Sequence, residues 1–428
     1  MNSKQRVVAA LQKQPVDRVP VFMWFHPETA RKFCKLLKIP GTGLSEAMGN
    51  DIQQTWVNNN YAMEGIEHEH DGETHVDWWG ITWEKRHGFN QILKYPYAGA
   101  TREAMLEYQF PYDHVEELLA LMKPVVDGRR DFYVGCDVSP CAFEMYWRLR
   151  GMDYAMLDMA DDPELAYEML AYKFPIERRD DLLALMNPIV NNRGDSFIGC
   201  DVSPCAFEMY WRLRGMDYAM MDMAADPELA DEMFRRCADF AIAVGTEACN
   251  RFALDWFWTG DDVAGQQRMM ISPKLWRALI KPHLKRVIDV GVSRGLPIAF
   301  HCCGALRPII PDLIEIGVNI LNPIQCNCSG MNPAELKKEF GANLAFMGGV
   351  DTQGLLPNGT AAEVRSYTEK LIADMTADGG GYILAASHTI SPETPNENIF
   401  AMYEAARISK AEIFDRAAAI RARVAVHS

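Results

Sequence analysis

Two residues that can bind a metal lie two positions apart in the second half of the chain. His301 and Cys303 follow the apolar run PIAF, which is typical of a β-strand. Because side chains two apart on an extended segment point to the same side, both can reach one ion. An imidazole and a thiolate together suit zinc. Cys302 lies between them, and we expect it to face the other way and pack.

Further metal-binding side chains follow later runs of the same kind. Cys326 comes after NILNP and His388 comes after YILAA. We predict that zinc is held by four side chains: His301, Cys303, Cys326 and His388. Cys328 and Gln325 are alternatives to Cys326. The competing interpretation is that these are buried thiols and hydrogen-bonded histidines of an ordinary core.

Carboxylates and aromatic rings stand beside the same strand ends. Asp261 and Asp262 lie in the turn TGDD, where they would orient substrate or relay a proton, or else cap a helix. Asp351 in GGVD has the same two interpretations. Substrate contacts are predicted for five residues: Trp24, His26, Trp256, Trp258 and Asp351. An aromatic lining would fit an aryl methyl ether or another flat ring, although tryptophans on strands are more often core.

Short apolar strands that alternate with amphipathic helices must position these side chains, which indicates an α/β fold. Strand-like runs in the second half repeatedly end in polar or ligand-type residues: TGDD, HCCG, QCNC, GGVD and SHT. In a β/α barrel the carboxyl ends of the strands meet at one mouth, where chemistry is built. We therefore predict one (β/α)8 TIM barrel over residues 1–428, with N-terminal additions.

A near-copy at a 64-residue offset interrupts the first half. Residues 108–171 and 172–235 are nearly identical, and each reads as helix, strand, then helices. Without one 64-residue copy, 364 of the 428 residues remain, enough for a full barrel. We predict a tandem duplication in which one copy occupies the barrel and the other is an insertion packed outside it. The alternative is that both units are integral to an enlarged fold.

Composition and charge restrict the partners. The 428 residues are 49% hydrophobic and 24% charged, as in ordinary globular proteins. With 43 basic against 58 acidic residues, the net charge of −15 argues against nucleic acid or an anionic membrane as partner. No apolar run approaches the roughly 18–20 residues of a spanning helix, and the start lacks a signal-peptide pattern. We expect a cytoplasmic protein with reduced cysteines. Association into a homodimer is one possible oligomeric state.

Several motifs resemble the uroporphyrinogen decarboxylase superfamily: DWFWTGDDVAGQQRMMISPKLW, HCCG, FMGGVDTQGLLPNG and SPETPNENI. The resemblance covers nearly the whole chain except the extra repeat, and it implies a (β/α)8 barrel with its site at the mouth. It also implies Asp51 as a site carboxylate. The superfamily has two functional branches: cofactor-free porphyrinogen decarboxylases, and zinc-dependent methyltransferases linked to corrinoids.

The methyltransferase branch is the more similar of the two. Decarboxylases carry an Arg-rich segment near the N-terminus for the porphyrin carboxylates, whereas VFMWFHPETARKF has one arginine, Arg31. The His-x-Cys pair of the methyltransferases matches His301 and Cys303. Their third ligand, usually a Cys before Pro-x-Thr-Pro, corresponds to His388 here. Either zinc is held by an altered set of ligands, or it is lost and His388 serves as an acid or base.

The resemblance therefore implies a methyltransferase that moves a methyl group between a small substrate or thiol and a corrinoid. A methoxylated aromatic is one such substrate, and the corrinoid would be carried by a partner protein. Two alternatives stay open. One is a metal-free, decarboxylase-like enzyme acting on a small carboxylate. The other is a non-catalytic docking protein that binds a partner through the repeat.

Overall fold

The computed structural model describes nine parts of the chain: residues 1–56, 68, 70–76, 82–86, 89–94, 133–137, 197–203, 205–214 and 216–427. Eight parallel strands form one sheet, and their order in space follows the chain. They are β1 (Ile52–Trp56), β5 (Tyr133–Asp137), β6 (Phe197–Asp201), β7 (Trp256–Gly260), β8 (Ile298–His301), β9 (Ile320–Ile324), β10 (Ala345–Val350) and β11 (Tyr382–Ala386). The later strands are mostly apolar because they are buried on both faces.

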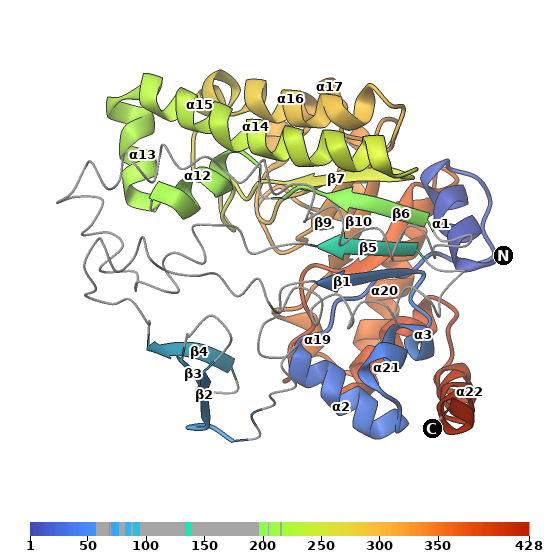
Figure 1. Ribbon diagram of the computed structural model, residues 1–428. Coiled ribbons are helices and arrows are strands. Elements are labelled where there is room, and N and C mark those ends of the chain that lie inside the picture. The colour runs from blue at the N-terminus through green and yellow to red at the C-terminus, as the bar shows by residue number, and fades with distance from the viewer. Residues whose placement is uncertain are drawn as a thin grey trace.

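A short segment, residues 19–25, joins the two edges of this sheet. On one side the Phe22 N–H donates to the Leu384 carbonyl in β11 at 2.9 Å. On the other side the Asp51 N–H, immediately before β1, donates to the Val21 carbonyl at 2.7 Å. The segment thus closes the sheet into a ring, and the predicted α/β barrel fold is confirmed (Figure 1).

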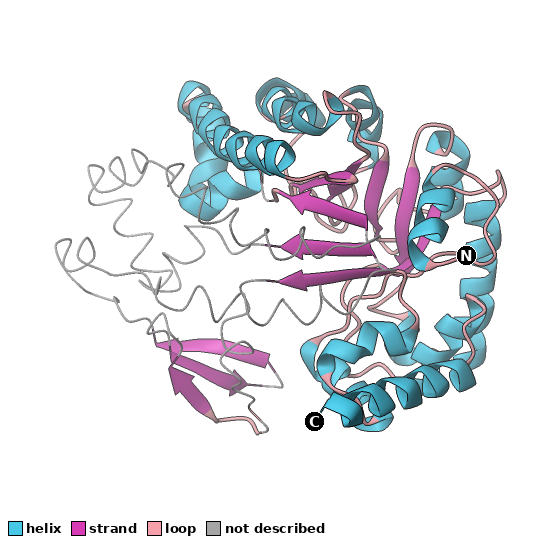
Figure 2. Cartoon of the chain, turned by 45° about the vertical axis from the view of Figure 1, so that its right-hand side comes forward, coloured by secondary structure: helices cyan, strands magenta, loops and turns pink. Residues whose placement is uncertain are grey.

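Helices cover the outside of the sheet (Figure 2). The helices after β6 are α12 (Phe207–Arg214), α13 (Met216–Ala225), α14 (Pro227–Arg251), α15 (Pro273–Leu279), α16 (Lys281–Val292), α17 (Ile310–Glu315), α18 (Pro333–Phe340), α19 (Leu355–Asn358), α20 (Ala361–Thr376), α21 (Asn396–Ala405) and α22 (Lys410–His427). Those before β1 are α1 (Ser3–Leu11), α2 (Pro27–Leu37) and α3 (Leu44–Met48), and two 3₁₀ turns span Gly41–Gly43 and Arg307–Ile309. No helix in these described parts is both long enough and apolar enough to cross a membrane.

Two apolar clusters fill the barrel and its surroundings. The larger one lies between the helices and the sheet and includes Cys302, which faces away from the interior as its alternation with His301 predicts. The smaller one fills the interior and includes Val7 of α1, Trp256 and Trp258. Because α1 contacts the starts of strands and contributes to the interior, it covers the amino end of the barrel. The carboxyl end is therefore the end where a functional site is expected.

Each copy of the repeat contributes a strand to the sheet. β5 from the first copy pairs in parallel with β6 from the second, and Gly135 lies opposite Gly199. The described strands thus favour the alternative that both copies take part in the barrel. Most of residues 108–171 lies outside the described parts of the chain, so an insertion of the remaining unit stays a prediction.

A separate antiparallel sheet follows β1 in the chain. It consists of β2 (Thr74–Val76), β3 (Thr82–Arg86) and β4 (Phe89–Lys94). An ion pair of 2.6 Å between Lys85 Nζ and Glu28 Oε1 connects it to α2. Figure 1 shows it on the side toward which the barrel strands point.

Candidate metal centre

Three side chains from two adjacent strand ends converge at the mouth of the barrel. Asp262 follows β7, His301 ends β8, and Cys303 lies two residues further on. One ligand atom from each lies within 4.8 Å of the other two, and His301 Nε2 is 3.7 Å from Cys303 Sγ. Within the described residues, this is the one such group of three metal-binding side chains.

Backbone contacts between the two strand ends hold the group together. Gly260 lies opposite His301 in the parallel register, and the Asp261 N–H donates to the His301 carbonyl at 3.0 Å. The Cys303 N–H donates to Asp262 Oδ1 at 2.8 Å. After Cys303 the chain turns at Gly304, whose φ is +93° and where a Cβ would lie 2.6 Å from a backbone oxygen. Only glycine allows this close approach.

The electrostatics of the group favour a bound cation. Burial, together with Asp262 and Glu208, raises the pKa of the Cys303 thiol to about 12. Partial desolvation of the imidazole and the neighbouring His301 lower the pKa of His388, and Asp262 opposes this effect. A thiolate at Cys303 therefore needs a positive charge beside it, which a metal ion would supply.

Of the four predicted ligands, the structure brings together His301 and Cys303. His388 follows β11 by two residues and is exposed at the mouth. It is near enough to His301 for the two to interact electrostatically, but it does not belong to the group of three. Burial raises the pKa of the Cys326 thiol to about 11, and the neighbouring Tyr367, whose hydroxyl donates to the Gly349 carbonyl, opposes this effect. Metal binding by these two side chains stays a prediction.

Asp262 is predicted from the sequence as a catalytic residue, whereas the structure places it with the two metal-binding side chains. A signal for it exists in the sequence, because Asp262 follows the strand that immediately precedes β8 in the chain. Consecutive strands of a barrel are neighbours, so their ends are the first places to look for a shared ligand.

Asp261 has a different environment from the residue beside it. Its fully buried carboxylate accepts the N–H groups of Phe207 at 2.9 Å and Glu208 at 2.6 Å. These are the first residues of α12, so Asp261 caps a helix from a loop more than fifty residues later in the chain. Burial raises the pKa of Asp261 to about 8, although the two donors oppose this effect.

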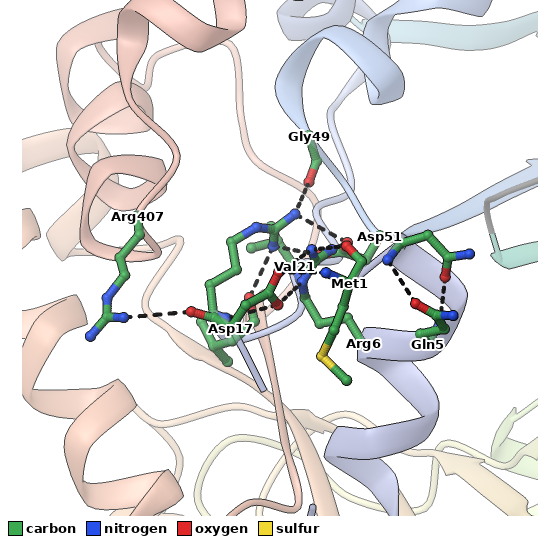
Figure 3. A network of polar contacts seen from close by, with 11 residues as sticks. Met1, Gln5, Arg6, Asp17, Val21, Gly49, Asp51 and Arg407 are labelled. Carbon is green, nitrogen blue, oxygen red and sulfur yellow. Dashed lines mark hydrogen bonds and ion pairs between the residues drawn. The ribbon is translucent and has the colours of Figure 1, made fainter. Parts of the chain in front are cut away.

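The structure does not bring Asp51 to the metal-binding group. It precedes β1 and so lies at the amino end of the barrel, opposite to the mouth. Its carboxylate accepts from Arg6 Nη1 at 2.5 Å, from Arg18 Nη1 at 2.6 Å and from the Val21 N–H at 2.9 Å (Figure 3). These contacts join α1, the closing segment and β1 and so support a structural role, while a catalytic role for Asp51 stays a prediction.

Aromatic rings line the interior next to His301. The Trp258 ring centroid is 6.4 Å and the Trp24 centroid 6.0 Å from that of His301, each inclined by 30°. Trp256 lies one layer deeper and meets Trp258 edge to face at 5.0 Å. Trp24 and Trp258 therefore lie beside the metal-binding group, and all three tryptophans belong to or pack against the same interior cluster, so substrate contact by these rings stays a prediction.

The two other predicted substrate contacts have local hydrogen-bond partners. His26 Nδ1 accepts the Glu28 N–H at 3.2 Å and so caps α2, and burial lowers the pKa of this histidine. Asp351 accepts N–H groups from the three residues Gln353, Gly354 and Leu355 at the start of α19. Both side chains stabilise turns at the mouth, and contact with substrate stays a prediction.

Comparisons with known proteins point to one family. Residues 196–408 match the family model described as uroporphyrinogen decarboxylase (URO-D). A curated relative, the methylated-thiol–coenzyme M methyltransferase of Methanosarcina mazei, is 22% identical over 204 residues, which are 47% of this chain and 50% of that protein. The match thus spans about half the length of that relative.

One solved structure shares the fold. A methyltransferase from Methanosarcina mazei superposes with a TM-score of 0.55 at 15% identity, covering 95% of this chain and 98% of that one. A putative sugar phosphate isomerase/epimerase from Anabaena variabilis gives a TM-score of 0.35 at 12% identity, covering 71% and 94%. At such identities the first likeness shows a common fold, and the second adds nothing to it.

Proposed function

We propose that this chain is a zinc-dependent methyltransferase of the uroporphyrinogen decarboxylase superfamily, which the family match over residues 196–408 and the similarity to Methanosarcina mazei methyltransferases support. The methyl group would move between a small substrate or thiol and a corrinoid that a partner protein carries, as the resemblance implies. The observation that carries the proposal is the convergence of Asp262, His301 and Cys303 at the open end of the barrel.

The residues present fit a zinc ion. They offer one oxygen, one nitrogen and one sulfur donor, which are the three kinds of atom that bind zinc in proteins. Three protein ligands leave a fourth position for a substrate, as in catalytic zinc sites. When bound, zinc would act as a Lewis acid that acidifies a thiol or polarises the leaving group of a methyl donor.

The side chains of this site would divide the work among them. His301 ends β8 and Cys303 lies two residues further on, and Cys303 Sγ would give up its proton if a cation were bound. The Asp262 carboxylate accepts the Cys303 N–H and would offer its charge to the same ion. Trp24 and Trp258 would hold a flat or methyl-bearing substrate beside His301 and exclude water from it. A methoxylated aromatic ring would fit beside these rings.

Metal content and methyl transfer test the proposal together. We expect about one zinc per chain in the purified protein, and demethylation of a methoxylated aromatic or a methylated thiol when reduced cobalamin, in its Co(I) form, is supplied as the acceptor and the leaving oxygen or sulfur takes up a proton. His301→Ala and Cys303→Ala should lose both zinc and activity. Cys302→Ala is the matched control, because this thiol lies between them but packs into the outer core.

The outcomes separate the alternatives. If Cys303→Ala kept both zinc and methyl transfer, the assignment of the site would be wrong. If metal-free protein released carbon dioxide from a small carboxylate and transferred no methyl group, the carboxy-lyase alternative would replace the proposal.

A further inference from the structure

We propose that Asn322 holds His301 in the tautomer that binds the metal; this inference rests on the proposed zinc site. His301 Nδ1 lies 2.7 Å from Asn322 Oδ1, on the adjacent strand β9. The Asn322 side chain is buried, with 3% of the residue exposed, so this contact is shielded from water. Asn322 acts through His301 and is a positioning residue.

The chemistry of the contact determines where the proton of the imidazole lies. An amide oxygen can only accept a hydrogen bond, so His301 Nδ1 must donate. In a neutral imidazole the other nitrogen then carries the lone pair. That nitrogen, Nε2, is the one 3.7 Å from Cys303 Sγ. The hydrogen bond to Asn322 thus directs the metal-binding lone pair toward the other ligands.

The backbone of the same residue contributes to the site. Asn322 lies opposite His301 in the parallel register of β8 and β9. Its carbonyl accepts the Cys302 N–H at 2.9 Å, which sets the start of the turn that leads to Cys303. One residue therefore orients the imidazole through its side chain and guides the thiol through its main chain. A substitution of the side chain removes the first of these contacts and keeps the second.

The test compares zinc affinities of metal-free protein reloaded in competition with a chelator. Asn322→Leu keeps the approximate size but removes the acceptor, and we expect zinc to bind about 10- to 100-fold more weakly, as is usual when a histidine ligand loses its partner. Asn322→Asp keeps an acceptor oxygen at the same place, and its zinc affinity should stay within a few-fold of the wild type or exceed it.

Asn319→Leu is the matched control for general damage. Asn319 Oδ1 accepts the Ile298 N–H at 2.7 Å, so this change also removes a side-chain contact between β8 and β9. It lies at the opposite end of the barrel from the metal-binding group. We expect a lower melting temperature and an unchanged zinc affinity.

Provided that the wild type binds zinc, any one of three results would overturn the inference. The first is an Asn322→Leu variant that binds zinc as tightly as the wild type. The second is an Asn322→Asp variant as weak as Asn322→Leu. The third is an equal loss in Asn319→Leu. If the wild type binds no zinc, the proposed function fails instead.

A measurement on the wild type covers the case in which Asn322→Leu does not fold. Nitrogen-15 NMR of histidine-labelled, metal-free protein distinguishes protonated from unprotonated ring nitrogens, and His301→Gln identifies the signal. We expect a protonated Nδ1 and an unprotonated Nε2. The opposite tautomer would refute the role of Asn322 whatever the metal content.

Discussion

Replacement of Asp51 by alanine should reduce stability and leave the chemistry intact. The carboxylate is fully buried and binds two arginines whose side chains are themselves only 8% and 16% exposed, Arg6 and Arg18. Asp51→Ala would leave the Arg18 guanidinium without this carboxylate and the Val21 N–H without its acceptor. Removal of one partner of a buried ion pair costs about 3–5 kcal/mol, because the remaining charge stays desolvated.

This free energy converts to a measurable melting shift. Unfolding entropy is roughly 2.1 cal/mol/K per residue, or about 0.9 kcal/mol/K over 428 residues if the chain melts as one unit. A loss of about 4 kcal/mol then lowers the melting temperature by about 4 °C. Differential scanning calorimetry would measure the shift, and zinc content and methyl transfer would be measured at a temperature well below it.

Asp17→Ala is the matched control for this prediction. Asp17 binds the same Arg6 but is 45% exposed, so its loss should cost at most about 1 kcal/mol. If Asp51→Ala melted like the wild type and lost methyl transfer, the structural role of Asp51 would be refuted and the catalytic role restored. A large shift in Asp17→Ala with none in Asp51→Ala would equally contradict the reasoning.

Two further substitutions test the carboxylates of the mouth. Asp262→Ala should weaken zinc binding at least about 10-fold, because it removes one of the three converging donors. Cys326→Ser tests the predicted second thiol in the same chelator competition, and a larger loss in Cys326→Ser than in Asp262→Ala would count against Asp262 as a ligand. Burial raises the pKa of Asp261 to about 8, above the roughly 3.9 of an unfolded aspartate. Between about pH 3.9 and about pH 8 the native state therefore binds one proton more than the unfolded state, and the native state loses stability as the pH rises. Asp261→Asn cannot bind this proton. As the pH rises from about 5 to about 8, the free energy of unfolding should therefore fall in the metal-free wild type and fall less in the metal-free variant. Urea denaturation at both pH values measures the gain, and a constant difference would contradict the assigned cause.

The barrel and the central pair of the site could be predicted from local patterns. His301 and Cys303 alternate on a strand, and the alternation of Cys302 between them predicted its burial outside the barrel. The apolar runs that end in polar residues predicted which loops meet at the mouth. These signals are local because strand alternation and barrel topology place side chains by short-range rules.

The roles of the carboxylates could not be predicted in the same way, because distant residues determine them. Asp51 is oriented by Arg6 and Arg18, which precede it by more than thirty residues. Asp261 caps a helix of the repeated unit, and the sequence of that helix start occurs in both copies. No local pattern distinguishes which copy it would cap. Only the three-dimensional order of the strands separates Asp261 from its neighbour Asp262.

Charge explains why Asp262 is a suitable third ligand for this chain. A neutral histidine with two thiolates, the set that the resemblance implies for the methyltransferases, carries two negative charges. His388 in place of the second cysteine would leave only one. Asp262 with His301 and Cys303 restores two, which balances the charge of a zinc ion in a site partly shielded from water.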